Sequence, residues 1–319
     1  MRALILGCGS IGSRHARNLA ALGVEVAVHD PDVERATAAA GQSGALQVRD
    51  RDAVEAEILV IATPTVQHVE DLAWGVRRGM HVFVEKPLAA DRAQLERARQ
   101  IQGELTSQVV MVGCNLRFTR GFGALADNLH RVGRMLAVRA TFGWYLPEWR
   151  PGQDYRHGYS AQRALGGGVI LDAIHEIDYV LALAGPVVSS TCRWTNTRTL
   201  DIDVEDLAEI VMTHRDGSIS STHLDYLQRV YTRSCQVTGT EGTLSWDYAA
   251  HRVDLACADF REVVLEQADL DANDMYVAQL QSFLEVVRTG APNANDLATA
   301  LATTEVAVRS MEDGGAWPG

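Results

Sequence analysis

A lysine in the first third of the chain has a setting that suits electrostatic chemistry. Lys86 belongs to the run Glu85-Lys86-Pro87, directly after the apolar stretch 81–84. At the end of a buried strand, a lysine can hold or polarise a substrate hydroxyl or carbonyl group. Pro87 keeps Lys86 extended rather than helical, and the bond between them can be cis. The alternative is an ordinary solvent-facing junction between a strand and a helix.

A histidine in the second half is the candidate for proton transfer. The triplet 166–168 is all glycine and leads into an apolar run that contains Asp172, His175 and Asp178. Asp172 precedes His175 by three residues, so in one continuous helix the two share a face. A carboxylate beside an imidazole fixes its tautomer and supports general acid–base catalysis. Asp178 can orient His175 from the other side, and the sequence leaves open which carboxylate does so. The alternative is a structural histidine near a helix start.

The first thirty residues predict the element that would position a cofactor beside Lys86. The apolar strand 2–6 leads into Gly7-x-Gly9-x-x-Gly12, a helix to about residue 22 and a second strand at 24–28. Gly7 permits a tight turn, Gly9 lets the backbone approach a pyrophosphate, and Gly12 lets helix and strand pack closely. The helix N-terminus, at Ser10 and Ile11, then offers free N–H groups to the phosphates.

Asp30 ends the second predicted strand and decides the choice of cofactor. Its carboxylate would accept hydrogen bonds from the adenosine ribose and repel a 2′-phosphate. The sequence therefore favours NAD(H), and NADP(H) is the alternative because Arg35 lies nearby.

Alternating strands and helices continue to about residue 118 and predict a parallel, doubly wound sheet. Further apolar strands are expected at 58–62, 81–84 and 109–112, with Asp91 as the N-cap of the helix at 91–102. Ligands bind beyond the carboxyl ends of such strands. Three segments follow those ends and should converge on the glycine loop: Thr63-Pro64-Thr65, Glu85-Lys86-Pro87 and Gly113-Cys114-Asn115.

Short alternating strands from residue 135 onward predict a second domain of another kind. Its largely antiparallel sheet includes a hairpin through Arg215-Asp216-Gly217 and strands near 232–238, 244–247 and 253–256. Helices at about 169–184 and 274–288 should cover one face, with a last helix at 295–311 and a loose tail at 314–319. The other face must meet solvent or another subunit. We therefore expect an α/β fold in two domains, 1–118 and 119–319, and a homodimer or homotetramer formed through the open sheet face.

Composition narrows the range of partners and compartments. The 319 residues are 47% hydrophobic and 22% charged, with a formal charge of −12. This balance argues against nucleic acid and anionic membranes as partners. Five scattered cysteines without a C-x-x-C pair indicate reduced thiols and no zinc ribbon. With neither a signal peptide nor a membrane-spanning stretch, a soluble cytoplasmic protein is expected.

Taken together, these motifs resemble the glucose–fructose oxidoreductase / inositol dehydrogenase / MocA (Gfo/Idh/MocA) family across nearly the whole chain. The resemblance implies an NAD(P)-dependent sugar or cyclitol oxidoreductase in which Lys86, Asp172 and His175 are catalytic. Many members place three residues between that aspartate and histidine, whereas only Ala173 and Ile174 intervene here. The expected cofactor contacts are Gly7, Gly9, Ser10, Ile11, Gly12, Asp30, Thr63, Pro64, His68, Glu85 and Lys86.

A second set of residues is expected to bind the substrate. The segment 115–118 and the loop 149–160 resemble a branch associated with amino sugars and nucleotide-activated sugars. A loop with aromatic, arginine and histidine side chains suits sugar stacking and anion recognition. The alternative for this loop is an ordinary ordered surface segment. The predicted substrate contacts are Lys86, Asn115, Arg117, Trp149, Tyr155, Tyr159, Asp172 and His175.

The predicted reaction is reversible hydride transfer between nicotinamide and a ring carbinol carbon, with no metal ion. His175 would take the hydroxyl proton and Lys86 would stabilise the developing oxyanion. One alternative is a glycosidase or epimerase in which bound NAD is reduced and reoxidised within a turnover. Another is a non-catalytic NAD-binding regulator. The sequence leaves open the substrate, the carbon oxidised, and whether the sugar is free or nucleotide-linked.

Overall fold

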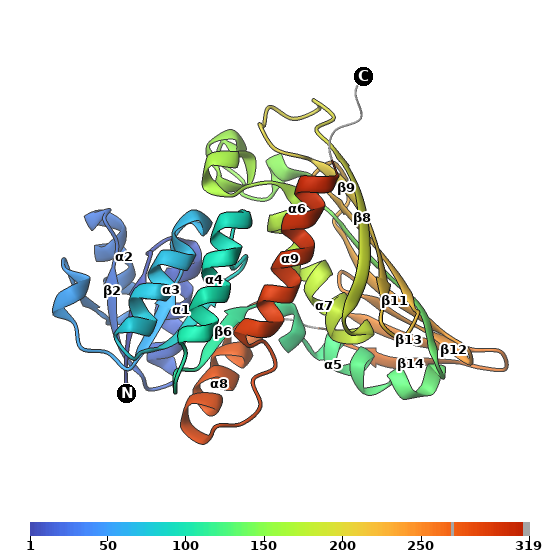
Figure 1. Cartoon of the computed structure of the whole chain (residues 1–319), viewed down its shortest axis with the longest axis horizontal. Coiled ribbons are helices and arrows are strands. Elements are labelled where there is room, and N and C mark those ends of the chain that lie inside the picture. The colour runs from blue at the N-terminus through green and yellow to red at the C-terminus, as the bar shows by residue number, and fades with distance from the viewer. Residues whose placement is uncertain (269–270, 315–319) are drawn as a thin grey trace. The chain divides into compact units, whose positions relative to one another are not determined.

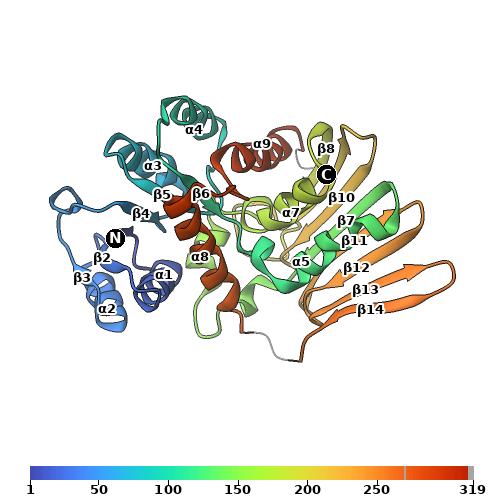
Figure 2. The ribbon, with the colours of Figure 1, turned by 90° about the horizontal axis from the view of Figure 1, so that it is seen from below.

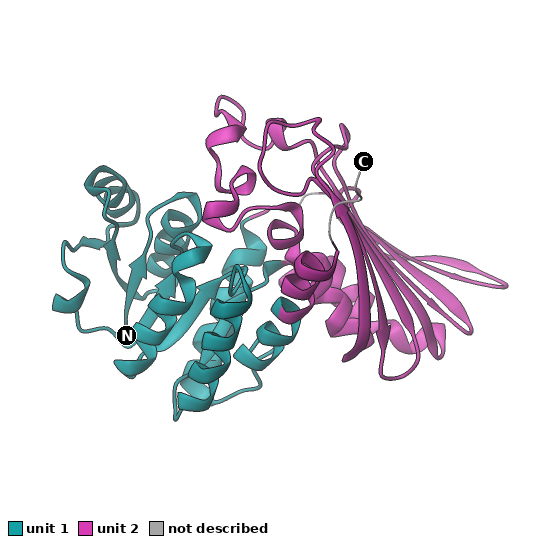
Figure 3. Cartoon of the chain, turned by 45° about the horizontal axis from the view of Figure 1, so that its top comes forward, with its two compact units in different colours: residues 1–115, 273–304 teal, residues 116–272, 305–319 magenta. Residues whose placement is uncertain are grey.

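The computed structural model describes residues 1–268 and 271–314, so the last five residues of the predicted C-terminal tail lie outside the described chain. The chain divides into two compact units, which Figure 3 shows in separate colours. The first unit comprises residues 1–115 and 273–304. The second comprises residues 116–272 and the segment from 305 onward.

The first unit is built on a six-stranded parallel sheet in the order β3-β2-β1-β4-β5-β6, the doubly wound arrangement predicted from the sequence. Apart from the exposed Arg2, the central strands β1 and β4 consist of buried apolar residues, because helices cover both faces of such a sheet. The strands are β1 Arg2–Leu6, β2 Glu25–His29, β3 Leu46–Gln47, β4 Ile58–Ile61, β5 His81–Glu85 and β6 Val110–Gly113. The helices are α1 Ser10–Ala21, α2 Val33–Ser43, α3 His68–Arg77, α4 Arg92–Glu104 and α8 Asp274–Thr289 (Figure 1).

The position of helix α8 differs from the predicted division of the chain. The helix was expected to cover the antiparallel sheet, but it packs on α1 in the first unit. The reason lies in the segment that follows α8. Asn293 donates to the carbonyl of Val110 at 2.9 Å, and Asn295 donates to that of Val112 at 2.7 Å. These amides bind the outer edge of β6, which has no neighbouring strand on that side, and they bring residues 273–304 back to the first unit. The division also falls at 115/116 rather than at the predicted 118/119.

The second unit is built on an eight-stranded sheet in the order β14-β13-β12-β11-β7-β10-β9-β8. Its neighbouring strands are antiparallel except for β7 and β10, so the predicted largely antiparallel sheet is confirmed. The strands are β7 Met135–Gly143, β8 Val187–Thr195, β9 Leu207–His214, β10 Ile219–Asp225, β11 Thr232–Gly239, β12 Gly242–Asp247, β13 Arg252–Cys257 and β14 Arg261–Glu266.

Helices cover one face of this sheet. They are α5 Arg120–Asp127, α6 Val169–Asp172 and α7 Ile174–Ala184, and α9 Leu297–Asp313 runs from the first unit into the second. Figure 2 shows α5 and α7 on the same side of the sheet. Side chains alternate along the strands, and Ala208, Ile210 and Met212 of β9 are buried under the helices. In the described part of the chain, no helix covers the opposite face.

Among the described residues, no helix is long and apolar enough to cross a membrane.

Candidate active site

The glycine loop between β1 and α1 is shaped by two close backbone approaches. Gly7 has φ +89°, and a Cβ there would lie 2.5 Å from the carbonyl oxygen of Ala62. A Cβ on Gly12 would lie 1.8 Å from the carbonyl oxygen of Gly7. Both positions therefore require glycine for reasons internal to the protein, namely a left-handed turn and close helix–strand packing.

Gly9 differs from its two neighbours in the motif. A Cβ there would meet no heavy atom of the described chain within 4 Å. Helix α1 starts at Ser10 with no side chain of the described residues capping it and no acidic residue in its first turn. The N–H groups of this turn, including those of Ser10 and Ile11, are therefore available. Open space beside an uncapped helix N-terminus fits the pyrophosphate of a dinucleotide.

Asp30 is held at the end of β2 by two backbone amides. Its Oδ2 accepts from the N–H of Cys8 at 2.7 Å, and its Oδ1 accepts from the N–H of Asp32 at 2.8 Å. Each carboxylate oxygen keeps a further lone pair for a ribose hydroxyl. Arg35, the residue that favoured NADP, forms an ion pair with Asp32 at 3.1 Å. Burial, and secondarily Asp30, raises the pKa of the Cys8 thiol to about 12, so Cys8 serves as a small structural residue.

His68 braces two of the strand-end turns. Its Nε2 lies 2.8 Å from the carbonyl oxygen of Thr63, and its Nδ1 lies 2.8 Å from that of Pro87. The ring is buried, and burial lowers the pKa of His68, while its hydrogen bonds to the two carbonyl groups act in the opposite direction. Thr63 donates its hydroxyl to Asp71 at 2.9 Å. The contacts of His68 thus tie the Thr63-Pro64 turn to the Lys86-Pro87 turn, whose peptide bond is cis.

Glu85 connects the lysine motif to the cofactor helix through a residue that the sequence reasoning missed. Its Oε1 lies 2.6 Å from Nε2 of His15, a fully buried side chain in α1. The His15 ring also makes edge contacts with Phe83 and Tyr276. Burial, and then the Glu85 carboxylate, raises the pKa of Tyr276. The only sequence signal for His15 is its position one turn after the glycine loop, which by itself indicates no contact with Glu85.

Asn115, predicted to bind substrate, is buried at the end of the first unit beside this cluster. A hydrogen bond with its side chain acts against the rise in the pKa of Tyr276. Lys86, Asn115 and Glu85 therefore belong to one unit, together with the glycine loop.

In the second unit, Gly168 opens the segment that carries the predicted acid–base residues. Gly168 has φ +113°, and a Cβ there would lie 2.2 Å from a carboxylate oxygen of Glu205. Glu205 accepts from the N–H of Ile170 at 3.2 Å and so binds the N-terminus of α6. Burial raises the pKa of Glu205 to about 7. The sequence reasoning did not identify Glu205, which precedes β9 by two residues.

Asp172 is a buried acceptor for three hydroxyl groups. Tyr159 donates to its Oδ1, while Ser160 and Tyr226 donate to its Oδ2 at 2.6 Å and 3.2 Å. These contacts fasten the loop around Tyr159 and Ser160 to α6. Tyr226, which lies just beyond β10, was not predicted as part of this site.

The continuous helix from which the pairing of Asp172 with His175 was predicted is interrupted between the two residues. Helix α6 ends at Asp172 and α7 begins at Ile174, with Ala173 between them at φ −94° and ψ 32°. A broken helix does not keep the three-residue register on which that prediction depends. The register does hold between His175 and Asp178, which both lie within α7. Asp178 also forms an ion pair with Arg117 at 3.8 Å, and His175 and Asp178 are both buried.

Helix α7 is fastened to the sheet by a buried ion pair. Nε of Arg233, on β11, donates to Oε1 of Glu176 at 2.8 Å, and Glu176 is completely buried. The Arg233 guanidinium lies 4.6 Å from the centre of the Phe142 ring. Since Glu176 follows His175 directly, this pair holds the part of α7 that carries His175 against β11.

The remaining predicted substrate residues fall in the loop after β7. Trp149 stacks on Trp144 and makes edge contacts with Phe142 and Tyr226. Tyr155 accepts a hydrogen bond from the N–H of Asp201 at 3.2 Å. Trp149, Tyr155, Tyr159, Asp172 and His175 all belong to the second unit, whereas Lys86 belongs to the first. That Lys86 and His175 face one shared crevice stays a prediction.

Within residues 1–268 and 271–314, no group of three or more His, Cys, Asp or Glu side chains is arranged to hold a metal ion.

Two family models match successive parts of the chain. The model described as an oxidoreductase family with an NAD-binding Rossmann fold matches residues 1–115. The model described as the GFO/IDH/MocA C-terminal domain matches residues 129–245.

Relatives of known name match over nearly the full length. The chain is 28% identical to an inositol 2-dehydrogenase of Rhizobium meliloti, covering 97% of this chain and 96% of that protein. It is 24% identical to a UDP-N-acetylglucosamine 3-dehydrogenase of Acidithiobacillus ferrooxidans, covering 92% and 90%. The solved structure of an enzyme of that name, GnnA from the same organism, superimposes with a TM-score of 0.83 at 21% identity, covering 98% and 97% of the two chains. This last likeness shows that the fold is shared.

Proposed function

The chain belongs to the Gfo/Idh/MocA family of NAD-binding oxidoreductases, and from this we propose that it oxidises a ring hydroxyl of a sugar, nucleotide sugar or cyclitol, or reduces the corresponding ketone. The named relatives support this substrate class, since they include dehydrogenases of inositol and of UDP-N-acetylglucosamine.

The residues of the first unit fit NAD. The uncapped turn at Ser10 and Ile11 would hold the pyrophosphate beside Gly9, where the protein leaves space for it. Asp30 would accept from the adenosine ribose with its remaining lone pairs. When bound, NAD supplies the carbon that takes up the hydride from the substrate.

Side chains of the protein then accept the proton and stabilise the developing charge. In the oxidative direction, His175 accepts the proton of the substrate hydroxyl. The ammonium group of Lys86 stabilises the oxygen as negative charge develops on it. Asp178 orients the imidazole from the same helix, and Asp172 orients it across the break at Ala173 or holds the substrate loop through its three hydroxyl donors.

The observation that carries this proposal is the contact between Glu85 and His15. This contact joins the turn that bears Lys86 to the helix that begins at the glycine loop, and both lie in the first unit. The distance from Glu85 Oε1 to His15 Nε2 is 2.6 Å. A lysine tied in this way to a dinucleotide loop is positioned for chemistry on the cofactor's substrate.

Turnover by the wild type and by two variants tests the proposal. Cyclitols, hexoses and nucleotide sugars are offered with NAD⁺, and NADH formation is followed by absorbance. Lys86→Ala and His175→Ala should each lower kcat by about 10²–10⁴-fold, while calorimetry shows NAD⁺ binding largely unchanged. Full activity in either variant would remove that residue from the mechanism. Product without net NADH would favour the glycosidase or epimerase alternative, and no product from any compound would favour the regulator.

Compartment and assembly complete the proposal. All five cysteines lie in the described part of the chain and none forms a disulfide, which is typical of a cytoplasmic protein. The face of the eight-stranded sheet opposite α5 and α7 exposes apolar side chains, including Val211 and Ile219. We place a homodimer or homotetramer contact on this face.

A further inference from the structure

Tyr226 is a buried tyrosine whose hydroxyl group binds a residue of the predicted reaction centre. It lies directly after β10, is completely buried, and donates to Oδ2 of Asp172 at 3.2 Å. A buried hydroxyl group on a buried carboxylate needs a physical reason, because both groups lose their hydration when the protein folds.

The backbone and the ring of Tyr226 are both held in place. Its N–H donates to the carbonyl of Asp206 at 2.9 Å, and its own carbonyl accepts from the N–H of Leu146 at 3.0 Å. The ring packs edge-on against Trp149, with the ring centroids 5.2 Å apart. The phenol oxygen therefore reaches Asp172 from a fixed position.

Ser160 is the second donor to the same carboxylate oxygen, at 2.6 Å. Its carbonyl accepts from the N–H of Gly168 at 3.1 Å. A Cβ on Gly167 would lie 2.2 Å from the carbonyl oxygen of Tyr159. The glycines before α6 therefore let the backbone of residues 159–160 pack directly against them, which places the Ser160 hydroxyl beside Asp172.

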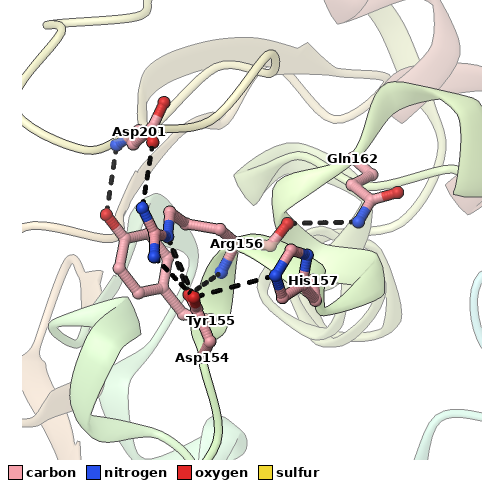
Figure 4. Close-up of polar contacts among 6 residues, drawn as sticks. All are labelled: Asp154, Tyr155, Arg156, His157, Gln162 and Asp201. Atoms are coloured by element: carbon pink, nitrogen blue, oxygen red, sulfur yellow. Dashed lines mark hydrogen bonds and ion pairs between the residues drawn. The ribbon is translucent and has the colours of Figure 1, made fainter.

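The segment that carries Ser160 is also bound to a neighbouring loop. The hydroxyl of Tyr155 accepts from the N–H of Asp201 at 3.2 Å, as Figure 4 shows. The N–H of Arg163 donates to Oδ1 of Asp203 at 2.7 Å. Because these contacts lie on both sides of Ser160 in the chain, its backbone is held from both ends.

The burial of Asp172 explains why its carboxylate needs several donors. Asp172 is 7% exposed, so its ionised form has little access to water. Hydroxyl groups that donate to a carboxylate favour its ionised form. Burial, and then the charge of Asp172, raises the pKa of Tyr226 well above its ordinary value. The phenol therefore keeps its proton and remains a donor.

We propose that Tyr226 is a positioning residue that acts through Asp172. Together with Ser160, its hydroxyl keeps the Asp172 carboxylate ionised and fixed in direction, just before the helix that carries His175. A carboxylate fixed there stabilises the imidazolium that forms when His175 takes the substrate proton. This inference rests on the proposed dehydrogenase function. It predicts an effect on the chemical step rather than on substrate binding, because the imidazolium exists only once the proton has moved.

A double-mutant cycle on the full chain tests this role. The substrate is the cyclitol, hexose or nucleotide sugar that forms NADH fastest. Tyr226→Phe removes only the hydroxyl and should lower kcat about tenfold or more, with KM changed by less than about threefold. Asp172→Asn removes the charge through which Tyr226 acts. In that background, Tyr226→Phe should lower kcat by less than about twofold.

Tyr179→Phe is the matched control. Tyr179 is also completely buried, but its hydroxyl lies 3.5 Å from Glu176 and 3.4 Å from the carbonyl of Ser234, which are long contacts. Its kcat and KM should stay within about twofold of the wild type. Unchanged kcat in Tyr226→Phe, an equal loss in the control, or an equal effect of Tyr226→Phe in both backgrounds overturns the inference.

Urea unfolding of the same variants gives a readout that needs no turnover. A hydrogen bond to a carboxylate is stronger than one to a neutral amide. Tyr226→Phe should therefore shift the unfolding equilibrium about fivefold more in the wild type than in the Asp172→Asn background. Equal shifts contradict the inference even if NADH forms. If no compound forms NADH, the dehydrogenase function is contradicted, and the unfolding cycle alone decides whether Tyr226 holds Asp172.

Discussion

At the scale of single residues, the candidate site depends on side chains that are fixed before any ligand arrives. Asp30, Glu85 and Asp172 each have a hydrogen-bond partner within the fold, so none of the three needs a ligand to define its position. Pre-positioned charged groups stabilise developing charge more effectively than mobile ones, because no reorganisation is needed during the reaction.

Substitution of Gly9 directly tests whether the glycine loop binds a dinucleotide. Gly9→Ala should leave the melting temperature nearly unchanged, since the new methyl group meets no described atom, and should weaken NAD⁺ binding at least tenfold by occupying the space of the pyrophosphate. Calorimetry measures the binding and thermal unfolding measures the stability.

Gly103→Ala is the matched control, because Gly103 also has open space around it but lies within α4. It should stabilise the protein by about 0.5–1 kcal/mol and leave NAD⁺ binding unchanged. Unaltered NAD⁺ affinity in Gly9→Ala would place the pyrophosphate elsewhere.

His15 is expected to act by positioning Glu85 and thereby Lys86. His15→Ala should lower kcat by about 10–100-fold with a much smaller change in NAD⁺ affinity, because the turn that bears Lys86 loses its tie to α1. His15→Gln keeps an N–H donor and should restore part of the activity. Steady-state kinetics and calorimetry measure the two effects. If Gln and Ala variants lose activity equally while both stay folded, the hydrogen bond to Glu85 has no positioning role.

At the scale of elements, the break between α6 and α7 organises the second half of the site. A continuous helix would have placed Asp172 and His175 on one face, whereas the break lets Asp172 bind the loop hydroxyls while α7 lies along the sheet. The N-terminus of α6 in turn depends on Glu205, a buried carboxyl group whose ionisation is unfavourable.

Because Glu205 is buried, we expect the stability of the protein to depend on pH. Burial raises the pKa of Glu205 from 4.5 to about 7 in the folded protein, so the folded state binds the proton more tightly than the unfolded state does. The stability that this group contributes is fully present below pH 4.5 and is lost as pH rises through about 7, by up to roughly 3 kcal/mol. Glu205→Gln should remove this decline, as urea unfolding between pH 4.5 and 8 would show.

The control for that experiment is Glu148→Gln, which changes an exposed carboxylate in the same unit. It should keep the wild-type pH profile. Parallel profiles for wild type and Glu205→Gln across this range would contradict the proposed proton linkage.

At the scale of the whole molecule, the proposed assembly would use the open face of the eight-stranded sheet. Val211 on β9 and Ile219 on β10 are 44% and 52% exposed, on strands whose other faces are buried by helices. Apolar side chains exposed on the face of a sheet gain from being covered by another subunit.

Val211→Lys should convert the assembled protein to monomers, because it places a charge on the proposed contact surface. Light scattering after size-exclusion chromatography measures the mass. Val230→Lys is the control, since Val230 is 77% exposed and lies between β10 and β11 rather than on a strand. A monomeric wild type, or an unchanged mass for Val211→Lys, would exclude this face as the contact.

What the sequence alone determined was local. Neighbouring residues are enough to predict four features: the glycine loop, the acid at the end of β2, the lysine motif and the alternation of strands and helices. This is because turn geometry and periodic burial act over a few positions. The tertiary structure alone decided which distant groups meet. His15 and Glu85 are 70 residues apart, and Tyr226 binds Asp172 across 54 residues. Likewise, α8 returns to the first unit because amides after it bind the edge of β6. Such contacts depend on strand order and on unsatisfied backbone edges, which no local pattern of residues encodes.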